Sequence, residues 1–101
     1  MAKRTTWGGE TERPLVLIRW HDAAIPLVGP PWRHTSTIAD AQPEQCSTAG
    51  WLVDADDVRF VVGQSIGSNA DELASWMIIP TGCVESVHYL TLGRAVRKGT
   101  L

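Results

Sequence analysis

The chain has 101 residues, of which 44% are hydrophobic and 20% charged, and its formal net charge is −2 at pH 7. This length allows at most one domain with one core, and the longest apolar runs, residues 15–18 and 76–79, are far shorter than the ~20 residues of a membrane span. No apolar stretch follows the N-terminal Lys3 and Arg4 as in a signal peptide, so we expect a soluble, cytoplasmic protein without membrane contact.

Charge is distributed unevenly along the chain. Residues 35–90 hold eight carboxylates and one arginine, whereas residues 91–101 hold three basic residues and no acidic one. Because contacts with duplex DNA need a contiguous cationic face, the acidic middle argues against a duplex nucleic-acid binder. The basic ends could hold one small anion or fold over the acidic body.

The predicted elements begin after a lead of residues 1–13, which has no apolar period and is expected to be flexible, with Trp7 as its one large apolar residue. Residues 15–20 are rich in β-branched residues and alternate, so that Val16, Ile18 and Trp20 form one apolar face. This pattern predicts a first strand.

Residues 21–45 contain four prolines, which interrupt both helices and β-ladders. We therefore expect a long loop after the first strand with at most a short turn of structure. Loops of this length are uncommon in compact domains and often functional, so this one is a candidate site.

Two β-rich segments follow, residues 49–53 and 58–63, joined by an Asp-rich turn that is typical of a hairpin. After a polar loop over residues 65–72, residues 76–79 predict a fourth strand. Residues 80–82 then predict a tight turn, and residues 84–92 a fifth strand. Residues 93–101 are expected to be a basic C-terminal tail.

This order predicts an all-β fold over residues 14–92, a small five-stranded barrel of Sm-like or Src-homology type in which closure removes the free sheet edges. The alternative is an open sheet of four or five strands with one helix at residues 69–76. Two cysteines, Cys46 and Cys83, lie in no CxxC arrangement and are interpreted as small buried hydrophobic residues.

Three segments carry a resemblance to known proteins: IRWHDA (18–23), AGWLVDADDVRFVV (49–62) and MIIPTGCVESVHYL (77–90). With their W-x-D-A, G-W-L and I-P-x-G-C motifs, they resemble a group of small uncharacterised phage and prophage proteins. The resemblance covers about a third of the chain directly. It implies a mobile-element origin, hence the host cytoplasm, and a small β-barrel, but its motifs specify strands and turns and supply no activity. The Pro-rich segment 24–45 departs from the pattern.

Five tryptophans in so short a chain exceed what a small core can conceal, so at least one indole is expected to meet a partner. Trp32, Arg33 and His34 follow two prolines and combine a stacking ring, a bidentate donor and a titratable ring, which suits a nucleotide. The competing interpretation is that Trp32 plugs the barrel. Trp20 and His21 complete the candidate ligand-binding set.

Catalytic and metal chemistry find no support in the sequence. His21 and Asp22 are neighbours on a strand and point to opposite faces. The histidines and cysteines fit no ligand spacing, and the residues Asp54 to Asp57 lack the glycine and distal glutamate of a calcium loop. The GxSxG letters at 63–67 lack the strand-to-helix elbow. We therefore expect no enzyme, no cofactor and no metal.

The favoured hypothesis is a phage accessory protein with an anti-defence role, a homo-oligomer that acts as a sponge for a nucleotide-type immune signal. The alternative is an acidic inhibitor or adaptor that occupies a basic site on a host defence protein. A small nucleotide-cleaving enzyme is a third hypothesis, which rests on the histidines alone.

Overall fold

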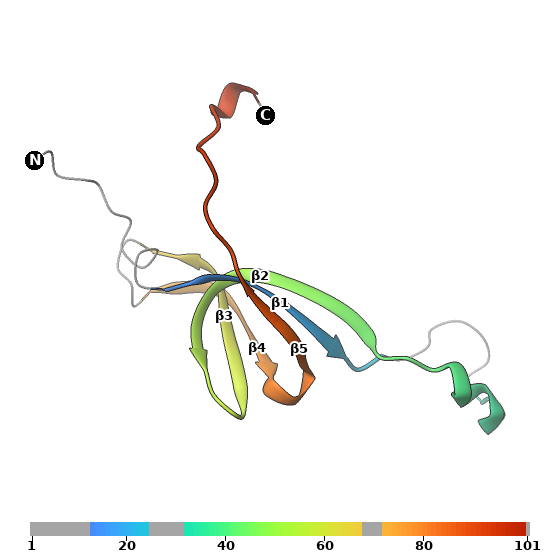
Figure 1. The fold of residues 1–101 in the computed structure, drawn as a ribbon. Coiled ribbons are helices and arrows are strands. Elements are labelled where there is room, and N and C mark those ends of the chain that lie inside the picture. Colours follow the sequence, from blue (N-terminus) through green and yellow to red (C-terminus); the bar gives the residue numbers. More distant parts are fainter. Residues whose placement is uncertain (1–12, 25–31, 68–71, 101) are drawn as a thin grey trace, which may run out of the picture.

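The computed structural model describes residues 13–24, 32–67 and 72–100, and over these residues the protein is nearly all β, as expected (Figure 1). Residues 1–12 of the expected N-terminal lead, with Trp7, lie outside the described residues. The five strands are β1 (Leu15–Asp22), β2 (Glu44–Ala55), β3 (Arg59–Ile66), β4 (Leu73–Pro80) and β5 (Val84–Tyr89). Three short 3₁₀ helices accompany them, η1 (Thr35–Asp40), η2 (Thr81–Cys83) and η3 (Lys98–Thr100).

The strands form one antiparallel sheet in the order β4-β3-β2-β1-β5. The 12-residue β2 is the longest strand. It pairs with β1 along its first part and with β3 along its second, and it curves strongly between them (Figure 1). The Thr48 hydroxyl of β2 donates to Met77 Sδ of β4 at 3.8 Å, so the curved sheet brings β4 opposite β1 and β2.

The curved sheet is barrel-like but not closed. Among the described residues, β4 pairs only with β3 and β5 only with β1, so two edges remain. The expectation that closure removes the edges is therefore wrong. The physical reason is local: η2 turns the chain between β4 and β5 without aligning their backbones into a ladder.

The core lies on the concave face of the sheet. Val16, Ile18, Val62 and Ile79 are at most 1% exposed and pack together. Trp20, Leu52, Phe60 and Val84 are partly buried against them. The predicted face of alternate apolar residues in the first strand is confirmed. Burial of each such side chain stabilises the folded state by ~1.5–3 kcal/mol.

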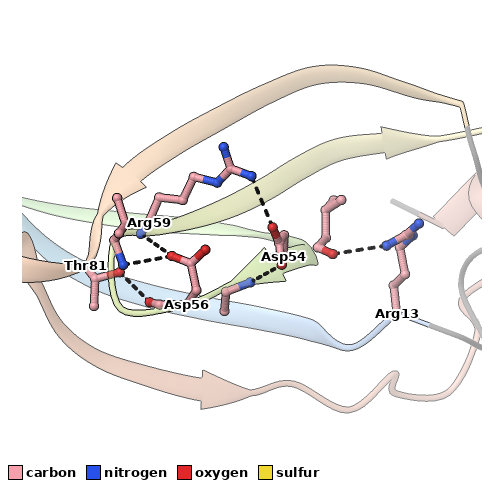
Figure 2. Close-up of polar contacts among 8 residues, drawn as sticks. Arg13, Asp54, Asp56, Arg59 and Thr81 are labelled. Carbon is pink, nitrogen blue, oxygen red and sulfur yellow. Dashed lines mark hydrogen bonds and ion pairs between the residues drawn. The ribbon is translucent and has the colours of Figure 1, made fainter.

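The β2–β3 turn is the predicted Asp-rich hairpin. Asp56 Oδ1 accepts the backbone amides of Val58 at 2.8 Å and Arg59 at 2.9 Å. The Thr81 hydroxyl at the start of η2 donates to the Asp56 carbonyl at 2.8 Å, which ties the turn to the end of β4 (Figure 2). One carboxylate therefore organises both the hairpin and its contact with η2.

These amides give a pH-dependent prediction. They hold the pKa of Asp56 below its usual value, and the lowered pKa makes the folded state more stable above the unfolded pKa of ~3.9. This contribution is lost as the pH falls through the lowered folded pKa. We expect Asp56→Asn, which keeps an acceptor oxygen, to melt below the wild type at pH 6, and we expect this gap to close as the pH falls below ~3.9. Thermal melts across this range measure the gap, and a gap that is constant with pH would contradict the prediction.

Strand ends differ from the sequence prediction: β5 is shorter and ends at Tyr89 instead of residue 92, whereas other strands are longer. β2 begins at Glu44 instead of residue 49, and β3 continues through Ile66. Residues 73–76 are strand, so the alternative with a helix at 69–76 is wrong for its described part. In the longer strands, pairing with a neighbouring strand extends β-structure into residues of low β-propensity such as Glu44 and Ala74.

Two segments extend away from the sheet. The segment around η1 lies beyond the end of the β1–β2 hairpin, and residues 90–100 leave the end of β5 and run outward (Figure 1). The radius of gyration is 19.0 Å, whereas a compact domain of this length has about 13 Å. The body of the protein is therefore small, and a sizeable part of the chain projects from it.

Candidate functional site

Two tryptophans lie on the convex face of the β2–β3–β4 region. Register places Trp51 of β2 and Trp76 of β4 on either side of Gly63 in β3. A Cβ at Gly63 would lie 3.2 Å from Leu73 Cδ2 and 3.5 Å from Val53 Cγ2, so these two side chains cover the glycine. They form an apolar floor next to Trp76, which lines the same groove.

This floor belongs to a groove of about 300 Å³, which is the lower end of the range for small-molecule sites. Its lining combines four apolar residues with one ion pair: Val53, Val61, Leu73, Trp76, Asp54 and Arg59. The Trp76 side chain is 59% exposed. One indole face is therefore available to a flat ring from solution.

The polar end of the groove is an ion pair between strands. Arg59 Nη2 donates to Asp54 Oδ2 at 3.2 Å, and both side chains are about half exposed (Figure 2). Asp54 Oδ1 also accepts the amide of Ala55 at 3.0 Å. A guanidinium has five donors and this contact uses one, so the pair offers further donors and carboxylate lone pairs to a ligand.

The backbone next to Trp76 is strained. Ser75 has φ of 55°, in the left-handed region that residues other than glycine rarely adopt. Such a conformation costs about 1–3 kcal/mol and is found most often at functional sites. In the middle of a strand it turns the backbone at the residue that precedes the exposed indole.

A second hollow of about 460 Å³ lies at the end of β1, between β1, β5 and η2. There His21 Nε2 lies 3.0 Å from Glu85 Oε2, and Asp22 and Cys83 also line the wall. Although this hollow is larger, two carboxylates face it. An anionic ligand is therefore disfavoured here relative to the groove that Arg59 lines.

The structure separates the site residues predicted from the sequence. Trp20 is partly buried against the core, and its Nε1 donates to Thr48 Oγ1 at 3.0 Å. This indole therefore stabilises the sheet by joining β1 to β2. His21 lies at the acidic hollow, on the strand position after Trp20. Asp22 Oδ1 accepts the amide of Ala23 at 2.8 Å, just after the end of β1.

Trp32, Arg33 and His34 lie in the segment that leads into η1, away from the sheet (Figure 1). Trp32 is 91% exposed, so among the described residues it does not plug the barrel-like body. His34 caps η1, because its Nδ1 accepts the Ser36 amide at 3.1 Å. The Trp32 ring is therefore available for stacking, whereas Nδ1 of His34 is already hydrogen-bonded within the segment.

The two cysteines are free thiols and partly buried, less buried than their interpretation as core residues requires. Desolvation, together with the nearby carboxylates of Asp22 and Glu44, raises the pKa of Cys46. A raised pKa keeps the thiol protonated and unreactive at neutral pH. Within the described ranges, no three His, Cys, Asp or Glu side chains are placed to hold a metal ion.

No protein-family model, curated protein or solved structure matches the chain. In the part of the chain that the structure describes, no helix is long and apolar enough to cross a membrane. Sequence reasoning missed the groove around Trp76. The sequence signal that could have revealed it is the alternation of side-chain direction in β3 and β4. Once the register is known, this alternation places Gly63 and Trp76 on the face opposite Val62.

Proposed function

We propose that the protein is a non-enzymatic binding protein that holds a nucleotide-type ligand against exposed indoles. The observation that carries the proposal is the groove in which a 59% exposed Trp76 lies beside the Asp54–Arg59 pair. Stacking of a base on an aromatic ring stabilises a complex by about 1–3 kcal/mol. A half-exposed indole beside an arginine supplies both stacking and anion recognition.

Each part of a nucleotide has a partner in the groove. The base stacks on Trp76 above the floor of Val53 and Leu73. The remaining guanidinium donors of Arg59 bind a phosphate. The Asp54 carboxylate accepts hydrogen bonds from sugar hydroxyls, as acidic residues do in dinucleotide sites. The ion pair keeps both groups in place before the ligand arrives.

Trp32, Arg33 and His34 provide a second set of the same chemistry on the η1 segment. The 91% exposed ring of Trp32 is the least covered large hydrophobic residue of the described chain. We infer that the biological role is sequestration of a nucleotide-type immune signal by a phage or prophage accessory protein, which requires binding and no chemistry.

Isothermal titration of the full chain against cyclic and ADP-ribose-type nucleotides tests this proposal. We expect heat with at least one member, and for Trp76→Ala a dissociation constant raised by about 5- to 150-fold, the equivalent of one lost stacking contact. Tyr89→Ala, an aromatic residue of β5 that is 78% exposed and does not line the groove, is the matched control and is expected to bind as the wild type does.

Two results would contradict the proposal: no heat with any member of the panel, or unchanged affinity in both Trp76→Ala and Trp32→Ala. Recovery of the ligand after heat denaturation of the complex separates binding from catalysis. We expect the nucleotide to be returned intact, whereas a cleaved product would indicate an enzyme.

One observation favours the alternative of an acidic inhibitor. The β2–β3 turn presents Asp54, Asp56 and Asp57 as exposed carboxylates at the tip of a hairpin, a shape that can enter a basic site. Such an interface would weaken steeply with salt. Pulldown of a basic host protein that is released by moderate salt, and lost in Asp57→Asn, would support this alternative over the nucleotide ligand.

A further inference from the structure

The edge strand β4 has the properties of a docking strand. Its sequence, Leu73–Pro80, contains no charged residue, and among the described residues it pairs on one side only, with β3. Trp76 and Ile78 on this strand are 59% and 53% exposed. Natural edge strands are usually protected from pairing with other chains by charges or by a covering segment. β4 carries no such charge, although Pro80 at its end and the left-handed Ser75 limit the length over which a new strand can pair.

The segment that follows β5 has the complementary pattern. Leu90 still donates its amide to the Leu15 carbonyl at 2.8 Å, and from there the chain runs outward from the sheet (Figure 1). Leu90, Leu92 and Val96 are 39%, 73% and 60% exposed and stand at even positions, the spacing of one strand face, which also includes Arg94. We refer to residues 90–100 as the arm.

The charges of the arm and of the β4 edge are also complementary. The arm carries Arg94, Arg97 and Lys98 and no acidic residue. β4 begins after Glu72, and its other end lies at the Asp-rich turn, where Thr81 bonds to the backbone of Asp56. Either direction of pairing along β4 therefore brings the basic end of the arm toward carboxylates.

We propose that the arm of one copy adds as a strand to the β4 edge of a second copy. The geometry favours a second copy because the arm starts from β5, at the opposite edge of the sheet order, and leads away from its own β4. Backbone hydrogen bonds along β4 give affinity, and the Leu92 and Val96 side chains cover Trp76 and Ile78, so arm exchange and a ligand stacked on Trp76 exclude each other. When both copies exchange arms, the interface is two-fold symmetric and closed.

Light scattering after size exclusion, over a wide range of protein concentration, tests the exchange. The chain mass is 11.0 kDa, and we expect the wild type to approach twice this mass as concentration rises. The full-length double variant Leu92→Asp/Val96→Asp is expected to remain at the monomer mass. Because the arm lies outside the sheet, this variant should melt like the wild-type monomer. Ile38→Asp, 66% exposed on η1, is the matched control and should dimerise.

Hydrogen exchange supplies the second readout. In the wild type, amides of residues 73–80 should gain protection as concentration rises, and the gain should be absent in the arm variant. A wild type that stays at 11.0 kDa at every concentration, or an arm variant that still dimerises, would overturn the proposal. Protection of β4 that is independent of concentration would indicate that the chain covers its own edge, and would also overturn it.

Discussion

Gly50→Ala is expected to be the most damaging single methyl addition in the described chain. A Cβ at this position would lie 2.6 Å from the Gly63 carbonyl oxygen and 2.7 Å from Val62 Cγ1. Overpacking of a core by one methyl group costs about 1–3 kcal/mol. The upper end applies here because the nearest atom is a backbone oxygen that is held in the β3 ladder. Gly50 lies where β2 passes from pairing with β1 to pairing with β3, so relief would require the sheet to open.

The measurement is thermal unfolding by circular dichroism. For a domain of this size each kcal/mol lowers the melting temperature by about 4–8 °C, so we expect a fall of more than about 10 °C. Gly82→Ala is the control, since its added Cβ meets no atom within 4 Å. Equal melting temperatures for Gly50→Ala and the wild type would show that β2 does not bend as described.

Ile79→Ala is expected to have a comparably large effect. Ile79 is fully buried in the core although it belongs to an edge strand, whereas its neighbour Ile78 is 53% exposed on the opposite face. Removing a buried isoleucine to Cβ costs about 2–5 kcal/mol. The same change at Ile78 should cost under about 1 kcal/mol, because surface substitutions have small effects.

Urea unfolding of both variants, at a concentration where the chain is monomeric, measures this difference. The pair is informative because the two residues share a strand, a chemistry and a substitution, and differ in the face that they occupy. A similar loss for both, or a larger loss for Ile78→Ala, would contradict the placement of β4 over the core.

Much of the fold followed from local pattern. Alternation in residues 15–20, the Asp-rich turn and the tight turn after Pro80 each specify their own structure through side-chain period or turn chemistry. Closure of the sheet did not follow, because it depends on how β4 and β5 meet across η2 after the whole sheet has curved. Strand ends such as Glu44 were missed because pairing with β1 outweighs the local preference of polar residues.

The sequence predicted the kind of site but not the residues that form it. The sequence indicated that some indoles would stay exposed, and Trp32 is indeed 91% exposed. It could not indicate that Trp76 would share a groove with Arg59 and Asp54, because these residues come from three strands and meet only through the β2–β3–β4 register. Trp20 was included for its residue type, yet its N–H bonds to Thr48 within the sheet.

Acrylamide quenching of tryptophan fluorescence tests the central claim most directly: the fold leaves indole surface uncovered for a ligand. In a Trp7→Phe background the four remaining indoles all lie in the described part of the chain. We predict a strongly quenched component in the isolated monomer that disappears when Trp32→Phe and Trp76→Phe are added. Equally weak quenching with and without these two changes would show that every indole is shielded, and would contradict the account.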